Sequence, residues 1–248
     1  MPRRALISTL SVLVFLGAWE IAPRLHLIDM AYTSQPSRVL AASLEAVRNA
    51  GFLHDLSVSF SEFAVGFALA VAMGVPLGLL LGVFPVMRYL ADPVVMAIYS
   101  TPYLALLPIL VVWLGIGMPS KMAAVFVGGV VPIVVNTMAG VRQVERCWVL
   151  AAQSFGGGKR DVLVKVILPA SLPGVMIGTR LGLSRAVLGM VVAEMYVSQA
   201  GIGSEIMRYG SAFRIDYLLF YVLVISGFGF AATRSLRVLE QRLWTADK

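Results

Sequence analysis

A chain of 248 residues of which 59% are hydrophobic and only 13% are charged is much more apolar than a soluble domain, for which about 45–50% and about 25% are typical. Its helices must be apolar on nearly all faces, which excludes an ordinary soluble enzyme and favours a protein solvated by lipid. The net charge of +7 fits basic cytoplasmic loops better than a nucleic-acid surface, so nucleic acid is not expected as a partner.

Six stretches of about 20 mainly apolar residues are long enough to cross a bilayer, and they predict an all-α integral membrane protein. These stretches are residues 5–22, 62–84, 93–114, 119–140, 175–195 and 216–234. The first one follows Arg3-Arg4 and is also compatible with a signal peptide. No small-residue cleavage site follows it, however, so a retained first helix is expected.

The basic residues predict the side of the membrane that each loop occupies. With the N-terminus inside, most Lys and Arg residues fall on the cytoplasmic side, in agreement with the positive-inside bias. Both termini and the loop with Lys159 and Arg160 are then cytoplasmic, whereas Lys121 and Arg208 belong to outer loops. The segment between the first two spans lies outside the lipid and contains a short amphipathic helix over residues 36–50.

Glycine and proline mark where these spans pack closely or bend. Small residues at every fourth position form ridges that let helices approach, at Gly74, Gly78 and Gly82 and at Gly174, Gly178 and Gly182. Prolines within spans free backbone carbonyls that a neighbour or water must satisfy, and they occur at Pro76, Pro102, Pro108 and Pro132. Such broken helices either line a pathway or form fixed kinks.

Residues 148–173 are too polar to span the bilayer and too regularly patterned to be a slack linker. Their first part predicts a helix with one face made by Trp148, Ala151, Ala152 and Phe155. Three glycines from Gly156 onward end this helix, and a positive φ is expected at Gly156. A second helix starts near Lys159 and should end by Pro169. The pair could rest on lipid headgroups, but the small alanines favour close contact with a protein.

The spacing in this loop resembles that of a known family. Leu150-Ala151-Ala152, three residues, Gly156, nine residues and then Val166-Ile167-Leu168-Pro169 follow the pattern EAA, three residues, G, nine residues, I-x-L-P. This pattern is typical of the inner-membrane permeases of binding-protein-dependent ABC importers. Leu150 replaces the Glu of the motif, which removes an expected ionic contact but not the docking surface.

Flanking segments extend the resemblance to the branch that serves nitrate, sulfonates, taurine and thiamine precursors. They are residues 103–117, residues 132–140, the run from Val192 to Glu194, Gly201 to Gly203, and the closing residues 239–244. The resemblance implies the transmembrane fold of a type I ABC importer and a pathway for a small solute such as nitrate, a sulfonate, taurine, bicarbonate or a thiamine precursor. Residues 1–56 would hold the first span and an extracytoplasmic segment, residues 57–240 the permease domain with the coupling loop 141–174, and residues 241–248 a cytoplasmic tail.

The resemblance also implies partners in a bacterial inner membrane. Cytoplasmic ABC ATPase subunits would bind the coupling loop, a second permease copy would complete a homodimer, and an extracytoplasmic solute-binding protein would deliver the solute. The residues assigned to ATPase coupling are Leu150, Ala151, Ala152, Phe155, Gly156, Leu168 and Pro169.

The chain itself is not expected to hydrolyse ATP or to hold a cofactor or a metal. Its nearest match to a phosphate-binding loop fails because Gln153 stands at the first glycine position and Arg160 at the Ser/Thr position. Cys147, His26 and His54 supply no metal-ligand spacing. An intramembrane hydrolase is disfavoured because no His accompanies a candidate serine in sequence.

Ionisable residues within the spans are costly in lipid and are therefore candidates for the transport pathway. Arg185 is expected to face the helix bundle, whereas Arg180 lies near the inner end and can reach the headgroups. Glu194 is too far along the helix to pair with Arg185, so another span or the second protomer must supply its partner. Weaker pathway candidates are Tyr103, Asn136 and Tyr196.

Two other classes of protein remain open on the residues alone. A self-contained secondary transporter or channel would also use intramembrane charges, but it predicts inverted internal symmetry and no docking loop. A membrane scaffold without transport activity would leave Arg185 and Glu194 unexplained. The ABC permease is the preferred interpretation.

Overall fold

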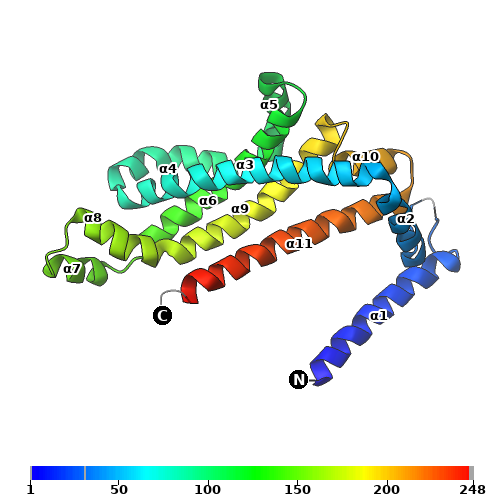
Figure 1. The fold of residues 1–248 in the computed structure, drawn as a ribbon, viewed down its shortest axis with the longest axis horizontal. Coiled ribbons are helices and arrows are strands. Elements are labelled where there is room, and N and C mark those ends of the chain that lie inside the picture. Colours follow the sequence, from blue (N-terminus) through cyan, green and yellow to red (C-terminus); the bar gives the residue numbers. More distant parts are fainter. Residues whose placement is uncertain (1, 31, 246–248) are drawn as a thin grey trace. The chain divides into compact units, whose positions relative to one another are not determined.

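The computed structural model describes residues 2–30 and 32–245, and within this part of the chain all regular structure is helical (Figure 1). In chain order the helices are α1 (Pro2–Arg24), α2 (Pro36–Arg48), α3 (Ala50–Val83), α4 (Pro85–Ser100), the 3₁₀ turn η1 (Tyr103–Leu106), α5 (Leu107–Leu114), α6 (Met118–Arg142), α7 (Arg146–Ser154), α8 (Lys159–Val162), the π-helical turn η2 (Leu163–Ile167), α9 (Leu168–Val197), α10 (Ile202–Ser211) and α11 (Ile215–Thr245). The predicted all-α fold is confirmed.

Five helical segments of the described chain are long and apolar enough to cross a membrane: Leu6–Arg24, Ala50–Val83, Met118–Arg142, Lys159–Val197 and Ile215–Val238. They match five of the six predicted spans. Three of them clearly exceed the predicted bounds: α3 begins at Ala50, the segment that contains α9 begins at Lys159, and α11 continues to Thr245, into the predicted tail. Residues 246–248 of that tail lie outside the described residues.

The predicted third span, residues 93–114, is not a single helix. It consists of the end of α4 followed by η1 and α5, and the two parts are bent by 89°. Thr101 has an extended backbone, with ψ of 133°, because a residue that precedes proline is disfavoured in the helical region. Pro102 therefore ends α4, and the pair counts as one broken span at most.

The helix that starts at Lys159 does not end by Pro169, contrary to the prediction. It continues through η2 and α9 as one helical segment from Lys159 to Val197. The wider π turn of η2 lies directly before Pro169, where the proline ring would otherwise meet the carbonyl of Lys165. The coupling loop is therefore joined to a spanning helix without a flexible break.

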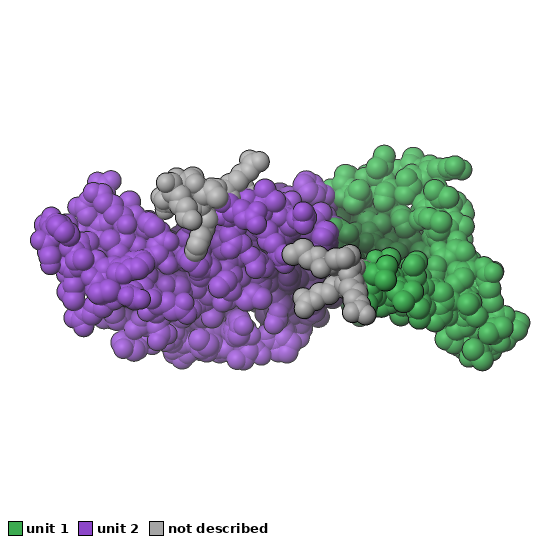
Figure 2. Space-filling model, turned by 90° about the horizontal axis from the view of Figure 1, so that it is seen from below, with its two compact units in different colours: residues 1–59, 194–227 green, residues 60–193, 228–248 purple. Residues whose placement is uncertain are grey.

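The described chain forms two compact units, drawn in green and purple in Figure 2. Unit 1 contains residues 1–59 and 194–227, and unit 2 contains residues 60–193 and 228–248.

Unit 2 is built around α6. In the most apolar 18-residue stretch of α6, 61% of the residues are buried inside the chain, against 28% or less in the other candidate spans. The two predicted glycine ridges pack on this helix within the same chain: a Cβ at Gly78 would lie 2.6 Å from the Cβ of Thr137, and one at Gly174 would lie 2.5 Å from the Cα of Gly140. The predicted role of the ridges in helix packing is confirmed.

The core of unit 2 joins α3, α6 and α9 through Phe63, Val125, Leu183, Ala186 and Met190. The ring of Phe63 stacks on Phe67 at 5.3 Å and meets the edge of Phe228 at 5.1 Å, which brings α11 to this core. Burying such side chains is worth about 1.5–3 kcal/mol each in water, although lipid supplies part of the same environment before packing.

Two cations of unit 2 form ion pairs that the sequence did not predict. The Lys121 side chain, near the start of α6, is 6% exposed and forms an ion pair with Glu62, whose side chain is 1% exposed. Arg180 pairs with Glu240 of α11 at 2.5 Å. In both cases the partner is a carboxylate from another helix of the same unit.

In unit 1, α2 is the predicted amphipathic helix and buries Val39, Ala42 and Ala46. Glu20 of α1 holds its first turn, accepting hydrogen bonds from the backbone N–H of Ser37 at 3.0 Å and from its hydroxyl at 2.7 Å. The N–H of Ser37, in the first turn of α2, has no partner within its own helix, so the carboxylate fixes α1 to the start of α2.

Candidate functional site

The short helix α7 presents unusual apolar side chains in an otherwise polar loop at one end of unit 2 (Figure 1). Trp148 is 54% exposed, Leu150 is 50% exposed and Phe155 is 93% exposed. Ala151 is also exposed, and Ala152 is partly buried. A side chain as exposed as Phe155 adds almost nothing to the packing of its own chain, so this surface is available to a partner.

The end of α7 is fixed by a defined backbone motif. The N–H of Gly157 donates to the carbonyl of Ala152 at 3.0 Å, and the N–H of Gly156 donates to that of Gln153 at 2.9 Å. These are the two hydrogen bonds of a Schellman motif, with Gly156 in the left-handed position. Its φ of +82° confirms the positive φ predicted there.

The next two glycines, Gly157 and Gly158, differ in how much space a side chain would have. A Cβ at Gly157 would lie 2.7 Å from the carbonyl oxygen of Ala152, whereas a Cβ at Gly158 would have the Asp161 carboxylate as its nearest neighbour, at 3.9 Å. The backbone N–H of Gly158 donates to that carboxylate at 3.3 Å and so starts α8. Leu168 and Pro169, the remaining coupling candidates, lie in the first turn of α9.

Two of the predicted pathway residues take part in helix packing. The hydroxyl of Tyr103 donates to the backbone carbonyl of Arg185 at 2.7 Å. The Tyr103 ring lies against Gly128 of α6 and Gly189 of α9, where there is no side chain in its way. Asn136 donates from Nδ2 to the carbonyl of Pro132 at 2.8 Å.

The Arg185 side chain is not buried among the helices of its own chain, so the predicted position facing the bundle would require a second copy. Arg185 is exposed on a face of α9 that also carries Ile177, Leu181 and Leu188, each between 46% and 51% exposed. The inward face of α9 is already occupied by the glycine ridge and Ala186, which leaves Arg185 on the other side. No ion pair or side-chain hydrogen bond of Arg185 is found among the residues that the structure describes.

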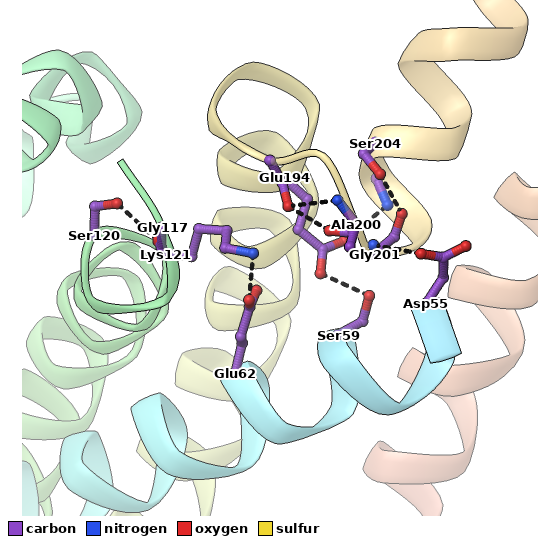
Figure 3. Close-up of polar contacts among 12 residues, drawn as sticks. Asp55, Ser59, Glu62, Gly117, Ser120, Lys121, Glu194, Ala200, Gly201 and Ser204 are labelled. Atoms are coloured by element: carbon purple, nitrogen blue, oxygen red, sulfur yellow. Dashed lines mark hydrogen bonds and ion pairs between the residues drawn. The ribbon is translucent and has the colours of Figure 1, made fainter. Parts of the chain in front are cut away.

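Glu194, at the end of α9, is fully buried in unit 1 and accepts two hydrogen bonds (Figure 3). The Ser59 hydroxyl of α3 donates to its Oε1 at 2.6 Å, and the N–H of Gly203 donates to its Oε2 at 2.7 Å. Glu194 thus meets a residue of another span, as predicted for its partner, and also the start of α10.

Two more amides at the start of α10 donate to side chains of α3. The N–H of Ile202 donates to the Ser59 hydroxyl at 2.9 Å, and the N–H of Gly201 donates to Asp55 Oδ1 at 2.9 Å. Gly201 has a φ of +112°, and a Cβ there would lie 2.5 Å from Glu194 Oε1. Three successive backbone donors are therefore held by side chains of α3 and α9, which gives α10 a rigid start.

Sequence reasoning missed Asp55, Ser59, Glu62 and Lys121. Glu62 and Lys121 stand at the beginning of two predicted spans, and opposite charges at helix ends are a usable signal for an ion pair (Figure 3). Nothing in the sequence connects Ser59 with Glu194, because they are far apart along the chain. Tyr196, the last pathway candidate, is 72% exposed. The described residues contain no group of three or more His, Cys, Asp or Glu side chains that could hold a metal ion.

Comparison with known proteins gives a consistent result. Residues 74–245 match the family of binding-protein-dependent transport system inner membrane components. The taurine transport system permease protein of Escherichia coli (strain K12) is 31% identical, covering 98% of this chain and 90% of its own length. A putative aliphatic sulfonates transport permease protein of Bacillus subtilis (strain 168) is 27% identical, with 93% and 83% covered.

A solved structure shares the fold. It is an inward-facing conformation of the MetNI methionine ABC transporter, with a TM-score of 0.56, 19% identity, 74% of this chain covered and 95% of the other. This likeness concerns the arrangement of the helices alone, because the identity is low.

Proposed function

Because this chain belongs to the family of binding-protein-dependent transport system inner membrane components, we propose that it forms the transport pathway for a sulfonate such as taurine. The chain is the permease subunit of an ABC importer for a small solute, and a separate subunit hydrolyses ATP. The alternative of a self-contained secondary transporter or channel is wrong, since the family match includes the loop with α7.

The proposed substrate is supported by the relatives and by one cation. The two relatives described above are permeases for taurine and, putatively, for aliphatic sulfonates. Arg185 places a guanidinium on an apolar face of a spanning helix, and a guanidinium matches the oxygens of a sulfonate with paired hydrogen bonds. The test is competition with the uptake of labelled taurine. If nitrate, bicarbonate or a thiamine precursor inhibits this uptake at lower concentrations than sulfonates do, the proposed substrate is wrong.

The observation that carries the coupling mechanism is the exposed face of α7 with its rigid, glycine-ended terminus. In the proposed complex two permease copies form the pathway, and the cytoplasmic ATPase subunits bind Leu150, Ala151, Ala152, Phe155 and Gly156. Leu168 and Pro169 lie in the first turn of α9, at the end of the continuous helix that leads from this surface. Because η2 and α9 continue the helix from the loop, movement of a bound ATPase would be transmitted directly to a spanning helix.

A charge on the docking surface should uncouple the ATPase. In Ala152→Asp and Gly156→Asp, overpacking costs about 1–3 kcal/mol and an unpaired charge in the interface adds to it, so ATPase binding should weaken by about 10–100-fold. The measurement is co-purification of the ATPase, together with ATP-dependent taurine uptake by proteoliposomes.

Two control variants separate docking from folding of the loop. Gly158→Ala should bind the ATPase normally, because the added Cβ has no neighbour closer than 3.9 Å. Gly156→Asn should retain part of the activity. Asn tolerates the left-handed conformation and has nearly the size of Asp, but it brings no charge into the interface. Normal ATPase binding and uptake by both Asp variants would show that α7 is not the docking site.

We further propose that both termini and the α7–α8 loop are cytoplasmic and that α10 is on the outer side of a bacterial inner membrane. The excess of Lys and Arg on the loops assigned to the inside supports this orientation. A second copy of the chain supplies the other half of the pathway in this proposal, since large apolar side chains remain exposed on nearly every spanning helix of the single chain.

Arg185 is the residue that we place on the pathway, because a guanidinium on a lipid-facing surface would be costly. Tyr196 remains a second candidate, and Tyr103, Asn136 and Glu194 are proposed to shape the pathway through the backbones that they hold. Arg185→Ala should lower taurine uptake about tenfold or more, the value of one charge-assisted hydrogen bond of about 1.5–3 kcal/mol. Arg185→Lys should be intermediate, because it keeps the charge but loses the paired donors.

The control for Arg185 is its exposed neighbour Ser184, whose replacement by Ala should leave uptake close to normal. Assembly is followed by size-exclusion chromatography with the ATPase, which none of these three variants should disturb. Equal uptake by the Arg185→Ala and unmodified proteins would remove Arg185 from the pathway.

A further inference from the structure

The short helix α10 ends with a non-glycine residue in the left-handed backbone conformation. The N–H of Arg214 donates to the carbonyl of Tyr209 at 2.9 Å, and the N–H of Phe213 donates to that of Gly210 at 3.1 Å. This is the same Schellman pattern that ends α7, but here the left-handed position is occupied by Phe213, with a φ of +53°. Glycine would be the least strained residue at this position.

The strained residue is also displayed to the outside. The Phe213 side chain is 66% exposed and Met207, on the preceding turn, is 41% exposed. A phenylalanine that is both strained and exposed stabilises its own chain less than glycine would. Strain of this kind is concentrated at functional sites, which makes this helix end a candidate for an interaction.

Two arginines are held beside these apolar side chains. The guanidinium carbon of Arg214 lies 4.0 Å from the centre of the Tyr217 ring, and that of Arg208 lies 4.7 Å from the centre of the Tyr209 ring. Arg208 also pairs with Glu205. Among the described residues, Arg214 has no carboxylate within ion-pair distance. The stacked rings fix the cations at the surface before any partner arrives.

We propose that Met207, Arg208, Phe213 and Arg214 form the surface on which an acidic face of the soluble binding protein docks. This inference rests on the proposed function, which gives the importer such a partner and places α10 on the outer side. Arginine, methionine and aromatic side chains are enriched in protein interfaces, and charge complementarity accelerates association. The anchoring of the α10 start by Asp55, Ser59 and Glu194 makes this surface rigid.

An anchor in the lipid headgroups is the competing explanation, because tyrosines and arginines also gather at membrane interfaces. In such belts the rings themselves meet the interface. Tyr217 and Tyr221 are instead only 4% exposed, and Tyr209 stacks on them at 4.8 and 5.7 Å. The rings support the arginines from inside the unit, which favours a protein partner.

Phe213→Gly separates function from stability. The variant should unfold at the same temperature as the unmodified chain or at a higher one, because glycine relieves the strained φ. It should also need about tenfold more binding protein for half-maximal stimulation of ATP hydrolysis, as expected for the loss of an aromatic interface anchor. The assay uses the purified permease–ATPase complex and a purified solute-binding protein that stimulates its ATP hydrolysis. Unchanged stimulation in Phe213→Gly would overturn the proposal.

The charge is tested with Arg214→Gln, since replacing Arg208 would also deprive the buried Glu205 of its ion-pair partner. At low salt the half-maximal concentration of binding protein should rise about fivefold, and the difference should disappear at 0.5 M salt, where the screening length is about 4 Å. Arg48→Gln on α2 removes another exposed arginine of the same unit and should have no effect. Equal effects of the two variants would contradict a specific surface on α10.

Further measurements decide between the partner and lipid, and between this inference and the function itself. Both effects should persist in detergent; if they occur only in vesicles with anionic lipid, the helix end binds headgroups and the proposal is wrong.

The side of the membrane is tested with Ser211→Cys in a Cys147→Ser background. This variant should react with an impermeant maleimide from outside, and labelling from inside alone would overturn the placement of α10. If the unmodified complex shows no stimulation by any binding protein while it assembles with the ATPase, the proposed function fails instead.

Discussion

Removal of one charge from the buried Glu62–Lys121 pair is expected to destabilise the chain severely. Glu62→Gln leaves the Lys121 ammonium, 6% exposed, without its carboxylate partner, and Lys121→Met leaves the Glu62 carboxylate, 1% exposed, without its cation. Breaking such a pair costs about 3–5 kcal/mol. In a chain of this size, the unfolding temperature should fall by roughly 10 °C. Thermal unfolding of the purified permease in detergent measures the effect.

The double variant Glu62→Leu/Lys121→Met tests the reason for this cost. Replacement of a buried ion pair by apolar side chains is often neutral or stabilising, so the double variant should be more stable than either single one. Lys165→Met provides the control, because the Asp161–Lys165 pair is exposed and is worth about 1 kcal/mol or less. Additive losses in the double variant, or equal losses in the control, would show that the burial of the pair does not matter.

Gly174→Leu is expected to prevent correct packing of α6 against α9. A Cβ at Gly174 would lie 2.5 Å from the Cα of Gly140, so backbone would have to move away from backbone. Overpacking of this kind costs about 1–3 kcal/mol in adaptable cores and should cost more where no side chain can yield. The yield of monodisperse permease on size-exclusion chromatography should therefore fall severely.

Gly229→Leu is the matched control for Gly174→Leu. It makes the same substitution in a long helix of the same unit, and no described atom lies within 4 Å of its added Cβ. The helix preference of the two residues changes equally, since Leu is better than Gly in both helices. A normal yield for Gly174→Leu, or an equal loss in Gly229→Leu, would mean that close contact of α6 and α9 is not what the glycine provides.

The sequence by itself determined the class of protein, five of the spans and the candidate docking loop. These are local properties: lipid requires each span to satisfy its own backbone hydrogen bonds, so a window of about 20 apolar residues is already informative. The left-handed position at Gly156 was also readable, because a run of glycines after an apolar helical face is a local end signal. The bend at Pro102 was only partly readable, since proline marks a break but not its angle.

The tertiary structure alone decided which charges meet and which faces are left open. Three contacts join residues far apart in the chain: the Ser59–Glu194 hydrogen bond and the Glu62–Lys121 and Arg180–Glu240 ion pairs. Hydropathy is a property of local sequence and does not predict which distant residues meet. Arg185 is exposed because its neighbour Ala186 faces the core. The composition of α9 does not determine which side of the helix faces the core. The physical reason is that helix formation in lipid depends on local sequence, whereas the pairing of helix faces depends on side-chain shape and charge across the whole chain.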